Sequence, residues 1–451
     1  MIDIHEEIGK LKNTNCAQDD VFHQAMEEVL LSIAPLFKAD DIYAQNAIIK
    51  RLVTPDRVIK FKVTWLDDNN IMQVNTGYRV QFNNALGPYK GGLRFHPSVN
   101  EGILKFLGFE QIFKNALTGL PIGGAKGGSD FDPKGKSDFE IMTFCSEFMT
   151  ELHKYIGPRI DIPAGDIGVG RREIGYLFGE YKKITSVFDG VLTGKPFMFG
   201  GSRMRTEATG YGVVYFTESM LEIENRQSMK GKVCAVSGAG NVALHAIEKL
   251  LDIGAIPVSC SDSSGTIYDA RGVDINLLKE LKLEQRVSLK EYVNTHTEAK
   301  FTPKEEYPQG GHAVWSIPCY AAFPCATQNE LTGLDAKNLI SNGCISVSEG
   351  ANMPSTPEAI EVFLKNKICF GPAKAANAGG VAVSEFEMSQ NAQMQKWSFE
   401  KVDDKLKETM TQICKAVSST AKEYGVEGNY VDGANIAGFK RVADAMIAEG
   451  I

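Results

Sequence analysis

The chain has 451 residues, of which 43% are hydrophobic and 23% charged, and its formal net charge is −8. The length predicts two or three domains, and the composition is that of an ordinary globular protein. An acidic balance offers no overall attraction for nucleic acid or an anionic membrane, so we expect neither as a partner.

The cysteines and the first residues predict a cytoplasmic protein. The nine cysteines form no Cys-x-x-Cys pair and have no nearby His pair, so we expect reduced thiols and no metal site. The opening residues Met-Ile-Asp-Ile-His lack the basic and then apolar pattern of a signal peptide. No segment reaches the ~18 apolar residues of a membrane span.

The first half of the chain mixes predicted helices and strands. Residues 19–38 have helical apolar spacing, and residues 58–65 and 71–82 alternate with a period of two, as strands do. Asn100 is a candidate N-cap for a helix over 101–118, and Ser137 with Glu140 forms a capping box. This region is therefore expected to be an α/β domain.

The second half repeats short apolar strands, loops and helices. The expected strands cover 233–237, 256–260, 313–317 and 345–348. Strands that alternate with helices predict a parallel sheet with helices on both faces. The Gly-rich segment 194–212 is the best candidate for the boundary between the two regions.

A dinucleotide-binding motif opens this second region. A buried strand precedes Gly238-x-Gly240-x-x-Ala243, and a helical run follows. The first glycine allows a tight turn, the second allows close approach of a pyrophosphate, and the helix N-terminus presents free N–H groups to it. We expect a nicotinamide dinucleotide as cofactor.

The residues alone leave the choice between NAD and NADP open. Asp262 lies 22 positions after Gly240, where a carboxylate that accepts ribose hydroxyls favours NAD. The neighbouring serines 261, 263 and 264 are able to donate to a 2′-phosphate instead, with countercharge from Lys282, Arg286 or Lys290.

Two lysines stand between glycine pairs before this motif. Lys126 lies in Gly-Gly-Ala-Lys-Gly-Gly, and Lys90 precedes Gly91 and Gly92. Alone, each is more simply a lysine in a surface turn. A desolvated lysine, however, has a lowered pKa that suits proton transfer, and two such contexts in one chain point to a site.

Two further polar clusters accompany the lysines. Gln111 and Lys114 are three positions apart and so share one face of the predicted helix, which is most often a solvated face. Asp166 stands alone in Pro-Ala-Gly-Asp-Ile-Gly-Val-Gly, where a helix cap is the simpler interpretation. Together with Lys126 it would supply the proton transfers needed at a carbon that bears nitrogen.

Six segments together resemble the hexameric glutamate dehydrogenases, of the NADP-linked type. They are 87–95, 120–128, 164–170, 237–243, 349–354 and 377–384. The resemblance covers nearly the whole chain, and its motifs are specific to the family. It implies a cytoplasmic homohexamer that interconverts L-glutamate with 2-oxoglutarate and ammonium, in the direction of ammonium assimilation.

The resemblance also implies roles for particular residues. Lys126 and Asp166 match the catalytic pair, with Lys126 activating water and Asp166 moving protons at the substrate nitrogen. The implied substrate contacts are Lys90 and Ser384 on the side-chain carboxylate, Gln111 and Lys114 on the α-carboxylate, and Gly165. The implied cofactor contacts are Thr209, Gly238, Gly240, Asn241, Val242, Asp262, Ser263, Asn352 and Asn377.

The same resemblance implies the domain limits and the cofactor. Residues 1–200, joined by 426–451, would form a substrate-binding and assembly domain, and 201–425 a Rossmann-like NADP-binding domain. The serine-rich turn is similar to that of NADP-linked members, so NADP is expected, with NAD as the less favoured cofactor. The alternatives are an NAD-linked glutamate dehydrogenase, a dehydrogenase of leucine, valine or phenylalanine, and a catalytically silent nucleotide-binding protein.

Overall fold

The computed structural model describes residues 8–9, 20–39 and 42–451, so the first position of the predicted helix 19–38 lies outside the described residues. The chain forms two compact units. Unit 1 comprises residues 1–203, 381–402 and 435–451, and unit 2 comprises residues 204–380 and 403–434. Among the described residues, no helix combines the length and apolar character needed to cross a membrane.

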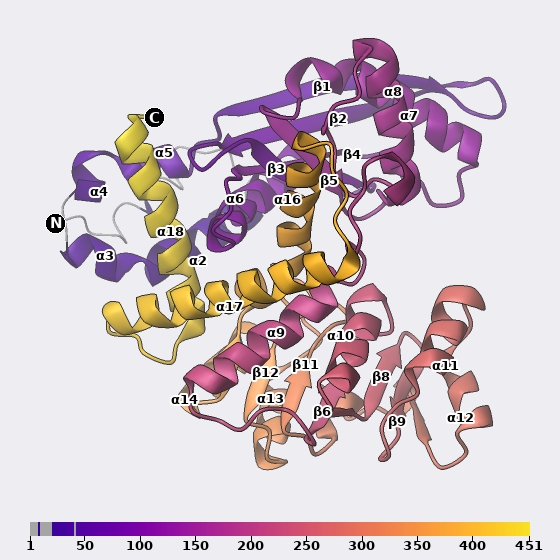
Figure 1. The fold of residues 1–451 in the computed structure, drawn as a ribbon, viewed down its shortest axis with the longest axis vertical. Coiled ribbons are helices and arrows are strands. Elements are labelled where there is room, and N and C mark those ends of the chain that lie inside the picture. The colour runs from indigo at the N-terminus through magenta and orange to yellow at the C-terminus, as the bar shows by residue number, and fades with distance from the viewer. Residues whose placement is uncertain (1–7, 10–19, 40–41) are drawn as a thin grey trace. The chain divides into compact units, whose positions relative to one another are not determined.

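Unit 1 is built on one mixed sheet of five strands (Figure 1). Their order is β1-β2-β4-β3-β5, and β3, β4 and β5 are parallel to one another. The elements are α2 (Asp20–Ser32), α3 (Ala34–Ala39), α4 (Ile42–Gln45), α5 (Ile48–Leu52), β1 (Arg57–Leu66), β2 (Met72–Asn83), β3 (Tyr89–Phe95), α6 (Glu101–Leu117), β4 (Gly124–Ser129), α7 (Asp138–Leu152), β5 (Asp161–Gly165) and α8 (Arg171–Thr185).

The local signals for the first region are confirmed. Asn100 Oδ1 accepts a hydrogen bond from the Ile103 amide at 3.0 Å, and α6 follows at once. Ser137 and Glu140 form the expected capping box at the start of α7. The predicted helix 19–38 is divided into α2 and α3, which end and begin on either side of Ile33.

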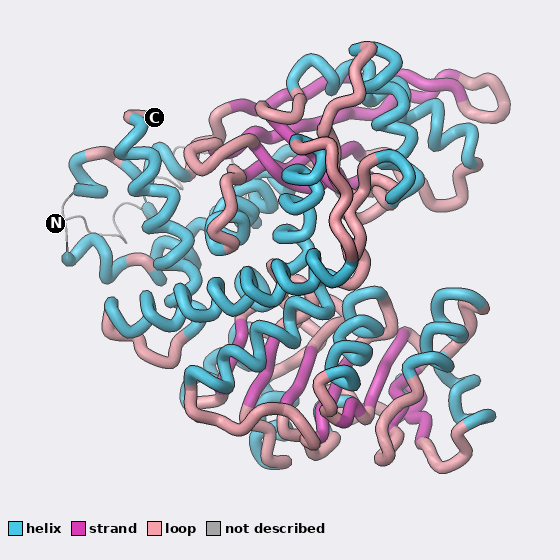
Figure 2. Tube along the Cα trace, viewed as in Figure 1, coloured by secondary structure: helices cyan, strands magenta, loops and turns pink. Residues whose placement is uncertain are grey.

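Unit 2 contains a five-stranded parallel sheet of order β13-β12-β11-β6-β7, as the alternation of strands and helices predicted (Figure 2). A separate antiparallel sheet joins β8, β9 and β10. The elements are α9 (Ala208–Ile223), β6 (Val233–Val236), α10 (Asn241–Asp252), β7 (Ile256–Pro257), β8 (Ser259–Asp262), β9 (Gly265–Tyr268), α11 (Ile275–Lys279), α12 (Tyr292–Thr295), β10 (Lys300–Pro303), β11 (Ala321–Phe323), α13 (Gly333–Ser341), β12 (Ser346–Ser348), α14 (Pro357–Lys365), β13 (Cys369–Gly371) and α15 (Ala373–Ala376).

Two strand predictions in this region need correction. Residues 313–316 form a short 3-10 helix, because the His312 side chain accepts from the Val314 amide and caps it. The buried Val314 and Trp315 mimic a strand in sequence, but the strand itself is β11. The predicted strand 256–260 is split at Val258 into β7 and β8, which belong to different sheets.

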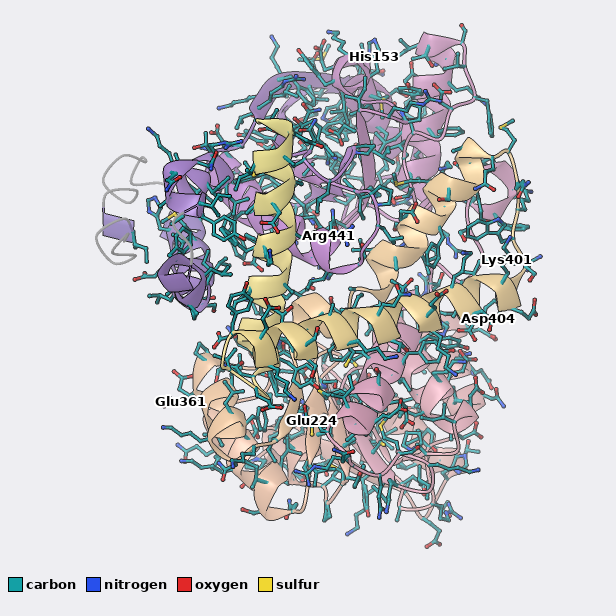
Figure 3. All side chains as sticks on the ribbon, turned by 60° about the vertical axis from the view of Figure 1, so that its left-hand side comes forward. His153, Glu224, Glu361, Lys401, Asp404 and Arg441 are labelled. Atoms are coloured by element: carbon teal, nitrogen blue, oxygen red, sulfur yellow. The ribbon has the colours of Figure 1, made fainter. Side chains whose placement is uncertain are left out.

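The last three helices pass from one unit to the other. They are α16 (Gly379–Ala392), α17 (Phe399–Glu423) and α18 (Tyr430–Glu449). Residues 381–402, which the sequence-based limits assign to the second domain, group with unit 1, where Asn391 donates to the Gly200 carbonyl at 2.7 Å. Within the same unit, Arg441 of α18 donates to the Gly119 carbonyl at 2.6 Å (Figure 3).

A buried ion pair connects three strands of the unit 1 sheet. Arg79 of β2 and Asp161 of β5 are both fully buried and share two hydrogen bonds, one of them 2.8 Å long from Nε. Arg79 also donates to the Gly91 carbonyl of β3 at 3.1 Å, and Gln81 donates to Asp161 at 3.0 Å. Every charged group in this cluster therefore has partners, as burial of charge requires.

Arg79→Met is expected to destabilise unit 1 by about 3–5 kcal/mol, because it leaves the buried carboxylate of Asp161 without its counter-ion. Urea denaturation followed by circular dichroism would measure the change in the free energy of unfolding. Lys154→Met is the control, since the Lys154–Glu151 pair is exposed (48% and 39%) and is expected to contribute less than about 1 kcal/mol. Equal effects of the two substitutions would contradict the assigned role of Arg79.

Candidate functional site

The predicted catalytic residues lie on, or directly after, two parallel strands of unit 1. Lys126 is in β4, and Asp166 follows the last residue of β5. The neighbouring strand β3 carries Arg94, which is in register with Gly128 of β4. Because β3 lies between β4 and β5 in the sheet, these residues come together although they are far apart in sequence.

Asp166 lies between two cations. Its Oδ2 atom is 3.3 Å from Lys126 Nζ and 2.8 Å from Arg94 Nε. Burial lowers the pKa of Lys126, and Arg94 lowers it further, although Asp166 opposes this. Burial also disfavours the ionised form of Asp166, but Lys126 and Arg94 outweigh it and hold the pKa of that carboxyl below its usual range.

Asp166 keeps contact with solvent while Lys126 is almost enclosed. The side chain of Asp166 is 20% exposed, and that of Lys126 is 8% exposed. Asp166 borders an open cavity of about 480 Å³ that is also lined by Lys134, Gly170 and Arg172. The carboxylate is therefore better placed than the amine to exchange protons with bulk solvent.

The second predicted lysine has a polar pocket of its own. Lys90 is buried, and its Nζ donates to the Thr193 hydroxyl at 2.8 Å. The backbone of the same lysine is held by Asn115, which donates to the Lys90 carbonyl at 3.1 Å. Gln111 donates in turn to Asn115 Oδ1 at 2.7 Å. Asn115 thus links Gln111 to the backbone of Lys90 through two hydrogen bonds.

The other predicted substrate residues also fall in unit 1. Lys114 lies one turn after Gln111 on α6 and is half-buried. Gly165 ends β5, and a side chain there would come within 2.5 Å of the Val169 carbonyl. Ser384 is buried on α16. Unit 1 therefore holds every residue that the sequence predicts for substrate binding and catalysis.

The glycines around the lysines allow close packing of the strands. A Cβ at Gly91 would lie 1.6 Å from the Ala125 carbonyl oxygen, and a Cβ at Gly92 would lie 2.8 Å from Asp166 Cβ and 3.3 Å from Lys126 Nζ. Sequence reasoning predicts that these glycines leave room for ligands. The structure adds a packing reason, because the predicted catalytic pair and strand β4 already fill the space that side chains would need.

The dinucleotide motif has the predicted local structure in unit 2. Gly238 follows β6 with φ of +88°, a conformation that favours glycine, and its amide donates to the Ser261 hydroxyl at 2.9 Å. Gly240 is the N-cap of α10, and Asn241 and Val242 form its first turn. A Cβ at Gly240 would meet no described atom within 4 Å, so intramolecular packing does not require this glycine.

The carboxylate of Asp262 is fully engaged inside the protein. Its Oδ2 accepts from Lys282 Nζ at 2.8 Å and from the Leu289 amide at 3.1 Å, and its Oδ1 accepts from both the amide and the hydroxyl of Ser264. Burial opposes ionisation, but these donors lower the pKa of Asp262. Ser263 at the tip of the turn is exposed.

The remaining cofactor candidates lie on two loops and a helix of unit 2. Asn377 donates to the Ala351 carbonyl at 3.0 Å and to Asn352 Oδ1 at 3.2 Å. Within the described part of the chain, the buried Oδ1 of Asn377 has no hydrogen-bond partner. Thr209 lies in the first turn of α9, where a Cβ at Gly380 would come within 2.7 Å of its hydroxyl.

A buried glutamate orders the loop that carries Asn352. Glu349 accepts from the Ser355 amide at 3.2 Å and from the Ala373 amide at 2.7 Å. Burial raises the pKa of Glu349 to about 7. The carboxylate thus joins the two segments on which Asn352 and Asn377 lie.

Sequence reasoning misses two residues of the lysine site. Arg94 follows Lys90 by four positions, and the period of two in a strand would have placed 90, 92 and 94 on one face of β3. Thr193 carries no local signal, because its partner Lys90 is 103 positions away.

The described residues contain free thiols and no group of side chains arranged as metal ligands. Every cysteine that the structure describes is free and buried. In the described ranges, no group of three or more His, Cys, Asp or Glu side chains is arranged to hold a metal ion.

Two family models match the chain. The model described as Glutamate/Leucine/Phenylalanine/Valine dehydrogenase matches residues 200–450. The model described as the Glu/Leu/Phe/Val dehydrogenase dimerisation domain matches residues 55–183.

Individual relatives match over nearly their full length. The chain is 62% identical to an NADP-specific glutamate dehydrogenase of Helicobacter pylori, over 95% of this chain and 96% of the relative. It is 53% identical to an NAD(P)-specific glutamate dehydrogenase of Xylanibacter ruminicola, over 99% of both chains. The crystal structure of Plasmodium falciparum glutamate dehydrogenase is similar with a TM-score of 0.93 and 52% identity, over 99% of this chain and 94% of that one.

Gly92→Ala is expected to separate Lys126 from Asp166, because the new methyl group would overlap the Asp166 side chain. A crystal structure of the variant would show the distance from Lys126 Nζ to Asp166 Oδ2 rising above the 4 Å of an ion pair. In the control Gly179→Ala, on helix α8, the new Cβ meets nothing within 4 Å, so the pair should keep its 3.3 Å separation. An unchanged separation in the Gly92 variant would refute the packing role of this glycine.

Proposed function

Because the chain belongs to the Glu/Leu/Phe/Val dehydrogenase family, we propose that it is an NADP-specific glutamate dehydrogenase, an oxidoreductase that reversibly deaminates L-glutamate to 2-oxoglutarate and ammonium. The observation that carries the proposal is the site of unit 1, where the buried Lys126 pairs with the partly exposed Asp166, and a second buried lysine, Lys90, lies on the same sheet. Ammonium assimilation is the proposed direction.

The lysines recognise the two carboxylates of the substrate. Lys90 and Ser384, joined by Thr193, bind the side-chain carboxylate, and a buried ammonium beside hydroxyl groups suits an anion. An aliphatic side chain in the same place would offer that buried ammonium no carboxylate to bind, which disfavours leucine, valine and phenylalanine as substrates. Lys114 and Gln111 bind the α-carboxylate, and Gly165 contacts the substrate.

Lys126 and Asp166 carry out the proton transfers. The lowered pKa of Lys126 favours the neutral amine, which activates the water that attacks the imino acid. When Lys126 is protonated, it stabilises the developing charge on the substrate oxygen. Asp166 remains ionised, touches solvent, and moves protons to and from the substrate nitrogen as ammonia leaves.

The residues of unit 2 fit an NADP cofactor. When bound, NADP accepts the hydride from Cα of glutamate. The open N-terminus of α10, with Gly238, Gly240, Asn241 and Val242, would hold the pyrophosphate. The unpartnered Oδ1 of Asn377 is an acceptor for a carboxamide N–H, and Thr209 and Asn352 complete that end of the site.

The network around Asp262 explains the preference for NADP over NAD. Lys282 neutralises this carboxylate, and Ser264 and Leu289 occupy its oxygens, so it is a poor acceptor for ribose hydroxyls. The exposed Ser263 is placed beside this neutralised carboxylate to donate to a 2′-phosphate. Asp262 therefore affects cofactor binding indirectly, by ordering the turn that carries Ser263.

The protein is proposed to work as a cytoplasmic homohexamer. One of the matching family models is described as a dimerisation domain, and the described cysteines are free. Small molecules, namely glutamate, 2-oxoglutarate, ammonium and NADP(H), are its proposed ligands.

The function is tested by mixing the purified protein with 2-oxoglutarate, ammonium and NADPH and following absorbance at the nicotinamide band. We expect rapid oxidation of NADPH, oxidation of NADH at least about 10-fold less efficient in kcat/KM, and no turnover when 4-methyl-2-oxopentanoate replaces 2-oxoglutarate. Equal use of both cofactors would reject the assignment of the Asp262 network. Turnover of the aliphatic keto acid alone would reject the glutamate assignment.

Arg94→Met is expected to shift the acidic limb of the kcat/KM profile to higher pH. Arg94 lowers the pKa of both Asp166 and Lys126, so its removal raises both values, and a higher pH is then needed to ionise Asp166 and deprotonate Lys126. At neutral pH we expect about a 10- to 100-fold lower kcat/KM. The control is Lys183→Met on α8, where the exposed Lys183 pairs with Glu180, and this variant should leave the limb in place. A limb that moves to lower pH in the Arg94 variant would contradict the assignment.

A further inference from the structure

A second buried ion pair of unit 1 has no part in the site as described so far. Lys195 Nζ lies 2.8 Å from Glu387 Oε1, and the two side chains are only 1% and 0% exposed. Lys195 follows Thr193 by two positions, and Glu387 lies on α16. Both residues belong to unit 1.

The pair holds the backbone on both sides of Thr193. Glu387 accepts from the Gly194 amide at 3.0 Å and from the Lys195 amide at 3.3 Å. The Lys195 ammonium donates to the Leu192 carbonyl. The Thr193 amide itself donates to the Pro163 carbonyl of β5 at 2.9 Å. The position of the Thr193 hydroxyl, which accepts from Lys90, is therefore fixed by contacts with Glu387, Lys195 and Pro163.

The same pair fixes the helix that carries Ser384. Ser384 and Glu387 are three positions apart on α16, so they project from one side of the helix. An ion pair at Glu387 thereby ties the position of Ser384 to that of Thr193. These are the two hydroxyl groups that the proposed function places beside Lys90.

Two buried charges are a costly way to join a helix to a loop. Well-packed apolar residues of the same volume stabilise a protein as well or better, so a buried ion pair is weak evidence for a role in stability alone. Its advantage is geometric, because a paired charge with fixed donors accepts little displacement. A site that recognises a carboxylate through three separate elements requires such precision.

We propose that the Lys195–Glu387 pair is a positioning device for recognition of the substrate's side-chain carboxylate, acting through Thr193 and Ser384. This inference rests on the proposed function. The two hydroxyls and the Lys90 ammonium come from α16, the 192–195 segment and β3, and the ion pair joins the first two of these elements.

The test compares KM values in Glu387→Gln, which removes the charge and keeps the shape. We expect KM for 2-oxoglutarate to rise about 10- to 100-fold, which is the effect of losing well-placed hydrogen bonds to a charged group. The KM for ammonium and the Kd for NADPH should stay within about 3-fold of the parent values. A purely structural role would lower the folded fraction, and so the apparent kcat, and would leave KM for 2-oxoglutarate unchanged.

A double variant covers the case in which Glu387→Gln fails to fold. Lys195→Met combined with Glu387→Gln leaves no unpaired charge, and it carries the same expectation for KM. Asn391→Ala is the matched control, since Asn391 anchors the same helix to Gly200 at 2.7 Å and should leave KM for 2-oxoglutarate within about 3-fold of the parent.

The outcomes separate this inference from the proposed function. A parent protein that does not oxidise NADPH with 2-oxoglutarate and ammonium would reject both. An active parent whose KM for 2-oxoglutarate is unchanged in the folded variants, or rises equally in Asn391→Ala, would reject the positioning role alone.

Discussion

One carboxylate between two cations organises the proposed catalytic site. Asp166 lies within 3.3 Å of Lys126 and within 2.8 Å of Arg94, and this close approach requires glycine where β3 faces it. Arg79 and Asp161 form another ion pair in the same sheet, and both are fully buried. Two of the cations that line the site, Lys90 and Lys126, are buried. A dianionic substrate would supply the negative charge that such an arrangement favours, which agrees with the proposed substrate.

In unit 2 the surroundings of a residue matter more than its identity. An aspartate after the second strand of a dinucleotide fold ordinarily indicates NAD. Here Lys282, Ser264 and Leu289 donate to both oxygens of the carboxylate. Asp262 therefore stabilises the turn. In the proposed function, the cofactor preference thus depends on a lysine 20 positions further along the chain, which no local motif contains.

Residues whose roles depend on neighbours in sequence were predictable, and those that depend on distant contacts were not. The caps at Asn100 and Ser137, the glycine turn at Gly238 and the parallel sheet follow from local spacing. The strand expected at 313–317 is wrong because the capping His312 outweighs the strand propensity of Val314 and Trp315. The roles of Thr193 and Glu387 could not be predicted from the sequence, because their partners Lys90 and Lys195 are far away along the chain.

The chain passes between the two units four times. On the ribosome, residues 204–380 of unit 2 are made before residues 381–402 and 435–451, which complete unit 1. At a synthesis rate of roughly 5–20 residues per second, the first 203 residues wait for at least several seconds without their partners. During that interval apolar surfaces such as Tyr43, which later packs on Phe439 at 5.4 Å, stay uncovered. Neither unit can therefore be excised as a continuous gene fragment.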